Sequence, residues 1–72
     1  MARIIFWAAE GPIADEQYAA AYALAEKYNV ELVPYGNSGG KALVHRFMVE
    51  GGPLRVVQFM RHIKAVFPRA TI

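Results

Sequence analysis

The segment from Arg3 to Ala9, with the sequence Arg-Ile-Ile-Phe-Trp-Ala-Ala, constrains the fold most, because as a strand it would be apolar on both of its faces. Successive side chains of a strand point to opposite faces of the sheet. This alternation gives two apolar sets, namely Ile4, Phe6 and Ala8 on one face and Ile5, Trp7 and Ala9 on the other. Both faces then need cover from water, so we predict a central strand of a sheet.

The size and composition of the chain predict one domain that buries part of its apolar surface against another molecule. The 72 residues contain no cysteine, which excludes a disulfide framework and a thiolate metal cluster. A chain of this size gains only a few kcal/mol of stability from its own core. Because 56% of the residues are hydrophobic and a small domain has much surface, we expect residues 1–72 to form a single domain that self-associates.

Two amphipathic segments predict helices. The first begins near Ile13, after Glu10-Gly11-Pro12, and carries an apolar stripe at spacings of three and four residues: Tyr18, Ala21, Tyr22, Ala25 and Tyr28. Asn29 suits the position just past its end, because asparagine tolerates a left-handed backbone. The second helix begins at Pro53, a residue favoured at the first helical position, and Pro68 stops it. Its stripe comprises Val56, Phe59, Met60, Ile63, Val66 and Phe67.

Two further strands are predicted between these helices. Residues 30–35 alternate in polarity, and Pro34 favours a place near the sheet edge because proline lacks a backbone N–H. Residues 36–40, Gly-Asn-Ser-Gly-Gly, predict an exposed turn. Residues 42–49 predict the third strand, whose pattern leaves open which of its faces is buried. Residues 69–72 fit either a short fourth strand or a tail.

The resulting order predicts an α+β fold of the ferredoxin-like type, β-α-β-β-α(-β), a two-layer sandwich with both helices on one face of an antiparallel sheet. The helix-free face would then carry either the Trp7 set or the Phe6 set. The alternative is a thioredoxin-like or doubly wound α/β fragment, in which the first two strands are parallel and adjacent.

Charge is distributed unevenly along the chain. The net charge is +2, but residues 1–36 carry −3 and residues 37–72 carry +5. Such asymmetry is typical of a chain that meets nucleic acid, an acidic protein or a second copy of itself. The candidate contacts to anions or nucleic acid are Lys41, Arg46, Arg55, Arg61 and Lys64. Trp7, Tyr35 and Phe47 are candidate interface aromatics, which on an open sheet could also stack on bases.

No motif predicts catalysis, a cofactor or a metal. The loop before Lys41 lacks the features of a phosphate-binding loop, since Tyr35 stands where a glycine is needed and Ala42 where serine or threonine is needed. The two histidines, His45 and His62, would have to converge with a carboxylate such as Glu10 or Glu50, and nothing in their spacing enforces this. The apolar run after Arg3 is too short for a secretory signal or a membrane span, so we expect a cytoplasmic protein without a membrane partner.

From these observations we expect a small non-enzymatic binding or interaction module that self-associates through an exposed sheet face. The alternative function is a small nucleic-acid-binding protein that uses the basic C-terminal half. An enzyme with its site at a dimer seam has the least support, because the chain supplies few catalytic groups.

Overall fold

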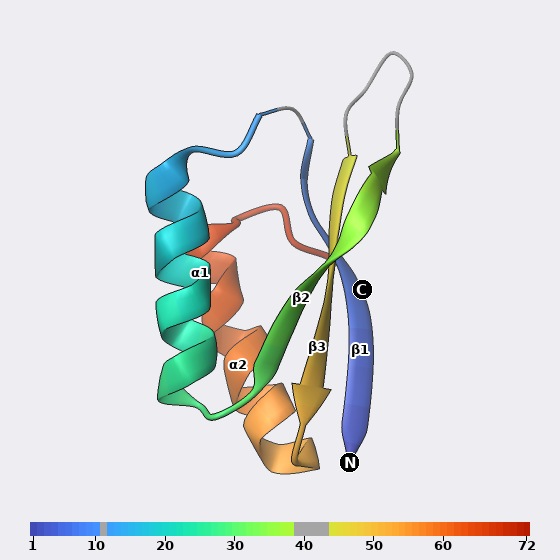
Figure 1. The fold of residues 1–72 in the computed structure, drawn as a ribbon, viewed down its shortest axis with the longest axis vertical. Helices are drawn as coiled ribbons and strands as arrows, with labels where there is room; N and C mark the ends of the chain where they lie inside the picture. Colours follow the sequence, from blue (N-terminus) through green and yellow to red (C-terminus); the bar gives the residue numbers. More distant parts are fainter. Residues whose placement is uncertain (11, 39–43) are drawn as a thin grey trace.

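The computed structural model describes residues 1–10, 12–38 and 44–72 and shows a three-stranded antiparallel sheet with two helices packed on one face (Figure 1). The elements are β1 (Ala2–Glu10), α1 (Asp15–Lys27), β2 (Glu31–Ser38), β3 (Val44–Gly51) and α2 (Pro53–Val66). The α+β class is therefore confirmed. The last two residues of the predicted turn, Gly39 and Gly40, the candidate contact Lys41 and the start of the third strand at Ala42 lie outside the described residues.

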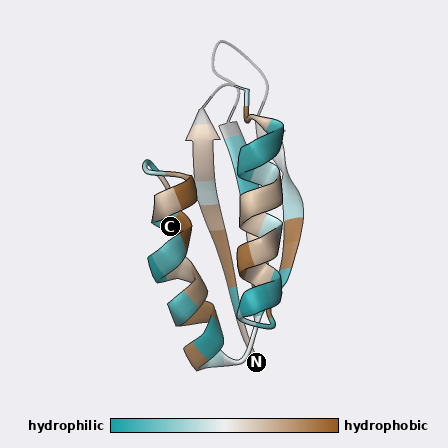
Figure 2. Cartoon of the chain, turned by 90° about the vertical axis from the view of Figure 1, so that its left-hand side faces the viewer, coloured by the Kyte–Doolittle hydropathy of each residue, from teal (hydrophilic) through white to brown (hydrophobic). Residues whose placement is uncertain are grey.

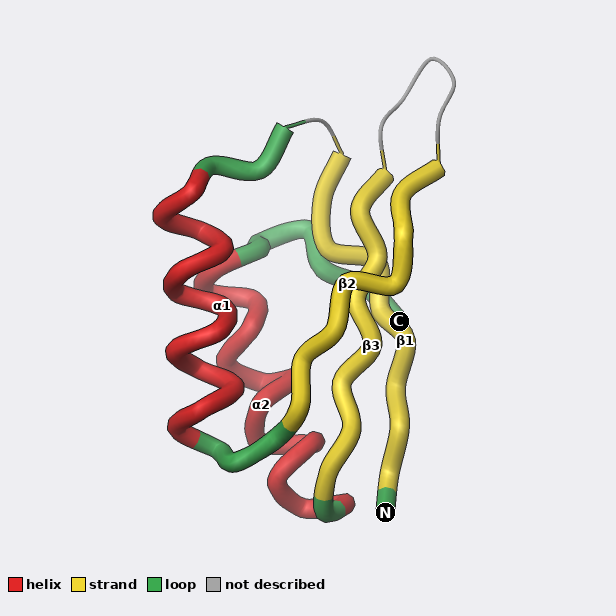
Figure 3. Tube along the Cα trace, in the orientation of Figure 1, coloured by secondary structure: helices red, strands yellow, loops and turns green. Residues whose placement is uncertain are grey.

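The strand order is β1-β3-β2, and β3 pairs antiparallel with both of its neighbours (Figure 3). The doubly wound alternative is wrong, because β1 and β2 are not adjacent. The prediction that the first strand is central is also wrong for this sheet, in which β3 takes the middle position. The apolar side chains of a strand indicate that both of its faces are covered. They do not indicate whether one or both of its edges pair with another strand.

The outer edge of β1 carries one isolated antiparallel bridge, between Trp7 and Thr71. The backbone N–H of Trp7 donates to the carbonyl oxygen of Thr71 at 2.7 Å, and the N–H of Thr71 donates back at 2.9 Å. Residues 69–72, which we call the C-terminal segment, therefore form no strand of their own, but this bridge holds them beside β1 (Figure 1).

The core lies between the sheet and the helices, which stand side by side in front of the sheet in Figure 2. Four phenylalanine rings fill its centre. Phe47 stacks on Phe6 with ring centroids 5.9 Å apart and on Phe67 at 6.0 Å, while Phe59 meets Phe6 at 6.2 Å. The buried apolar residues are Phe6, Ala8, Ala21, Ala25, Val30, Leu32, Phe47, Val49, Val56, Phe59, Ile63, Phe67 and Ala70.

The second strand continues further than the sequence predicts. Gly36, Asn37 and Ser38 pair with β3, although they were expected to begin a turn. The register shifts between Pro34 and Gly36, and Gly36 has a φ of 117°, a backbone angle that favours glycine. This β-bulge lets the strand resume pairing after Pro34. Its place at the edge of the sheet agrees with the prediction from Pro34.

The end of α1 depends on a left-handed residue. Asn29 has a φ of 54°, as the sequence predicts, and its N–H donates to the carbonyl oxygen of Glu26 at 3.1 Å. The chain then turns directly into β2.

We expect Asn29→Ala to lower the free energy of unfolding by about 1 kcal/mol, because a Cβ-bearing residue without a polar side chain is disfavoured at this backbone angle. Asn29→Gly is the matched control and should be neutral or slightly stabilising, because glycine has no Cβ to clash. Urea denaturation followed by circular dichroism measures both variants. An alanine variant as stable as the wild type would contradict the assigned backbone conformation.

Candidate interaction surface

The face of the sheet opposite the helices carries the Trp7 set of β1. Phe6 and Ala8 are 1% exposed beneath the helices, so the intervening side chains of β1 point to the other side. We call this helix-free side the open sheet face. It comprises Arg3, Ile5, Trp7, Glu31, Val33, Arg46, Met48 and Glu50, with Tyr35 at the bulge of β2 beside them.

The strand register arranges these side chains in three rows across the sheet. The middle row is apolar, since Met48 pairs with Ile5 on one side and with Val33 on the other. Ile5 is 40% exposed, and Val33 and Met48 are half-buried. A contiguous apolar row on the helix-free side of the sheet is a candidate interaction surface.

The row toward the start of β1 is acidic. Glu50 pairs with Arg3 in β1 and with Glu31 in β2. The Arg3 Nε donates to the Glu50 carboxylate at 2.7 Å, and within the described part of the chain this is the only ion pair. Arg3 neutralises Glu50, so the carboxylate of Glu31 gives this row a net charge of −1.

The third row is basic and aromatic. Arg46 pairs with Trp7 in β1 and with Gly36 in β2. Its side chain is exposed, Trp7 is half-buried, and Tyr35 at the bulge is 57% exposed. The open sheet face thus has an apolar middle with opposite charge at its two ends.

Phe47 is not an interface aromatic. It is 1% exposed and lies on the helix side of β3, where Phe6, Phe67 and the edge of Tyr18 surround it. Of the three aromatics predicted at the interface, Trp7 and Tyr35 lie at the open sheet face or beside it. The middle-row residues Val33 and Met48 were not among the predicted site residues, although the alternation of β2 already put Val33 on one face with Tyr35.

The predicted basic contacts do not gather in one patch. Arg46 lies on the open sheet face, whereas Arg55, Arg61 and Lys64 project from α2 in the other layer, and Lys41 lies outside the described residues. The nucleic-acid hypothesis requires these cations and the sheet aromatics to share a surface. Among the described residues, only Arg46 meets that condition.

The histidines lie in separate places and have structural surroundings. His62 on α2 has its Nδ1 3.0 Å from the Gln58 carbonyl oxygen, to which it can donate, and 3.2 Å from the Tyr28 hydroxyl. His45 on β3 has a buried Nε2 without a hydrogen-bond partner in the described structure. Glu50 is occupied by Arg3, and the side chain of Glu10 lies outside the described part. Within the residues described, no three metal-ligating side chains come together.

Comparisons of the chain with known protein families, with characterised proteins and with solved structures found no match. The part of the chain that the structure describes has no helix long and apolar enough to cross a bilayer.

Proposed function

We propose that this protein is a small interaction module that forms a homodimer by packing two open sheet faces against each other. The single observation that carries the proposal is the apolar row of Ile5, Met48 and Val33, flanked by rows of opposite charge. Antiparallel sheets often leave one face in water, but that face is then mainly polar.

The charges of the open sheet face favour a second copy as the partner. A two-fold axis along the middle row places this row on its own copy and brings Arg46 of each subunit to the acidic end of the other, near Glu31. A two-fold axis along the strands would instead place Arg46 on Arg46, which like charges oppose. The first arrangement satisfies the self-complementarity that a symmetric dimer requires.

We also propose that the architecture is the ferredoxin-like one, with its fourth strand only begun at Thr71. The strand order β1-β3-β2 and the antiparallel bridge on the outer edge of β1 both fit this layout. The dimer proposal does not depend on it, because the open sheet face is built from β1, β2 and β3 alone.

Sedimentation equilibrium tests the proposed function. We expect a concentration-dependent mass that approaches twice 8.0 kDa at tens of micromolar protein. Added salt should weaken the association, since salt screens the contacts between Arg46 and the acidic row. Met48→Lys should leave the fold intact and abolish the dimer, because it places two cations at the centre of the interface. A monodisperse wild-type monomer in this range would refute the proposal.

A further inference from the structure

Met48 lies at the centre of the open sheet face. It is the middle residue of the apolar row, between Ile5 of β1 and Val33 of β2. Its side chain is half-buried in the single chain, so part of it remains in contact with water. Because Ile5 and Val33 carry only aliphatic carbon, Met48 is the one residue of this row that a peroxide readily oxidises.

The proposed dimer, on which this inference rests, brings the two Met48 side chains together. A two-fold axis along the middle row maps each residue of the row onto its own copy in the other subunit. The thioether of Met48 then meets the thioether of the second Met48, and Ile5 and Val33 of both subunits enclose the pair. Thioethers suit this place because they pack as flexible apolar groups.

Oxidation changes the polarity of this sulfur. A lone pair of the Met48 sulfur attacks one oxygen of hydrogen peroxide, and the S–O bond forms as the O–O bond breaks. The leaving hydroxide takes the proton from the transferred oxygen and departs as water, so the sulfur is oxidised while the peroxide is reduced. The product, methionine sulfoxide, is polar, and its oxygen accepts hydrogen bonds.

We propose that Met48 is an oxidation site that controls association, so that the reduced chain forms the dimer and the sulfoxide form remains a monomer. In the monomer the sulfoxide oxygen lies on the open sheet face, where water can bind it, so the fold should not change. In the dimer two sulfoxides would be enclosed by Ile5 and Val33, whose side chains offer no donor. Burial of a polar group without a hydrogen bond is unfavourable.

Arg46 is the cationic donor beside Met48 on β3, but it does not compensate for this burial. It lies two residues away on the same face of the strand, and its guanidinium could donate to a sulfoxide oxygen. In the proposed dimer each Arg46 meets Glu31 of the other subunit. A guanidinium that turned to the sulfoxide would leave that carboxylate without its counter-charge, so the oxidised dimer loses either a hydrogen bond or an ion pair.

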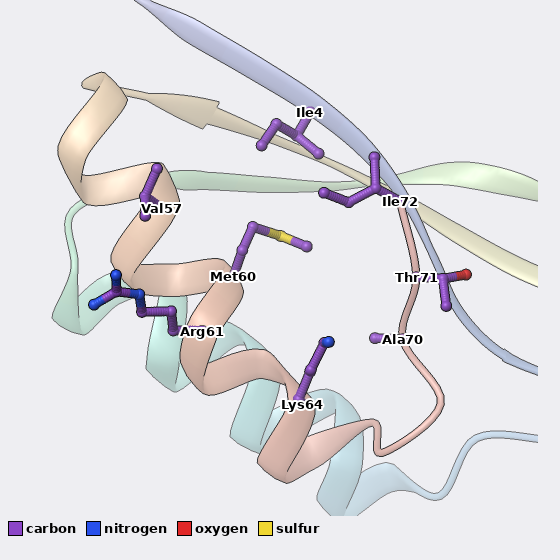
Figure 4. Close-up of a pocket in the computed structure, with 8 residues that line it drawn as sticks. All are labelled: Ile4, Val57, Met60, Arg61, Lys64, Ala70, Thr71 and Ile72. Atoms are coloured by element: carbon purple, nitrogen blue, oxygen red, sulfur yellow. The ribbon is translucent and has the colours of Figure 1, made fainter.

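Met60 provides a comparison within the same chain. It belongs to α2, packs against the core and lines a cavity of about 620 Å³ that Ile4 and Ile72 also border (Figure 4). Like Met48 it is half-buried, so peroxide should reach both side chains. Because Met60 lies in the helix layer, its oxidation does not place a polar group between two open sheet faces.

The test compares the full chain before and after treatment with hydrogen peroxide. Sedimentation equilibrium measures the dimer, peptide mass spectrometry measures oxidation at each methionine, and far-UV circular dichroism follows the fold. Conversion of Met48 to the sulfoxide should raise the dissociation constant of the dimer about 100-fold, roughly tenfold for each of the two buried sulfoxides. Methionine sulfoxide reductases with dithiothreitol should restore the dimer. Met48 should also oxidise more slowly as the protein concentration rises, whereas the rate at Met60 should not depend on it.

Matched variants assign the effect to Met48. Met60→Leu keeps most of the apolar volume and should respond to peroxide as the wild type does. Met48→Leu should bind its own copy equally well before and after peroxide, because the oxidisable sulfur is gone. Met48→Gln, which places a polar amide in the middle row, should associate weakly without any peroxide.

The possible outcomes separate the oxidation site from the dimer itself. An untreated chain that stays monomeric would refute the proposed function and the oxidation site with it. A dimer that forms and remains equally tight after complete oxidation of Met48 would overturn the oxidation site alone. A loss of helical circular dichroism on oxidation of Met48, or an equal loss of association by Met48→Leu in peroxide, would also overturn it, because the cause would then lie in the fold or in another residue.

Discussion

Phe47→Ala should leave the chain largely unfolded at 25 °C. Phe47 is 1% exposed, and three other aromatic rings surround it with centroids 5.9 to 6.1 Å away. Truncation of a buried phenylalanine to alanine costs about 3–5 kcal/mol. Since a domain of this size has only a few kcal/mol of stability in total, the loss is comparable to the whole margin. Far-UV circular dichroism and urea titration at low micromolar concentration would show it.

Tyr35→Ala is the control for that experiment. It also removes an aromatic ring, but from a side chain that is 57% exposed, so the free energy of unfolding of the monomer should change by less than about 1 kcal/mol. Phe47→Leu keeps most of the buried volume and should fold with intermediate stability. A well-folded Phe47→Ala protein with wild-type stability would show that the ring does not hold the two layers together.

Arg46→Glu and Glu31→Lys should each strongly weaken self-association, and a mixture of the two variants should restore it. In a dimer of R46E alone, two contacts bring carboxylates together. In a dimer of E31K alone, two contacts bring cations together. In the mixed dimer both contacts join opposite charges, one through the substituted residues and one through the original Arg46 and Glu31. We expect each single variant to bind itself about 100-fold more weakly than wild type, as two lost charge contacts imply.

Two controls test the geometry behind this result. Arg55→Glu and Glu26→Lys make the same charge changes on exposed helix residues, and they should leave the dimer intact alone or mixed. R46E mixed with wild type should associate more weakly than wild type does with itself. Stronger association in that mixture would contradict the proposed axis, because it would show that Arg46 of one subunit meets Arg46 of the other. Sedimentation velocity with one labelled variant distinguishes these species.

The helices could be predicted because their signals are local. The stripe of α2 repeats over four turns between Pro53 and Pro68, and Asn29 marks the turn after α1 through its own backbone preference. Tertiary packing reinforces these signals without changing them.

The sheet was only partly predictable, because its register and lateral order depend on distant residues. Both alternating sets of the third strand contain large apolar side chains, and the core selects the set with Phe47 and Val49. Arg46, which belongs to the other set, was the available signal, since arginine is seldom buried without a partner. No local sequence pattern, in contrast, predicts that β3 and not β1 is the central strand.

The sequence predicted that the candidate site is an exposed sheet face, but it did not predict which residues form the middle of that face. The apolar surplus and the aromatic pair Trp7 and Tyr35 indicated an exposed sheet face. Its middle row depends on the pairing of Ile5, Met48 and Val33 across three strands, which only the register supplies. The sequence also does not predict the cavity that Met60 lines, because residues of α2 and of the C-terminal segment border it together.

The pairing of β1 with β3, in preference to the nearer β2, also affects how the chain acquires its structure. The hairpin of β2 and β3 joins neighbouring segments, while Phe6 must find Phe47 across an intervening helix and strand. Closing so long a loop is entropically costly, so we expect the hairpin to form early and the first strand to dock late. During synthesis on the ribosome, β1, which is apolar on both faces, emerges before its partner β3, so the nascent chain is the stage most exposed to aggregation.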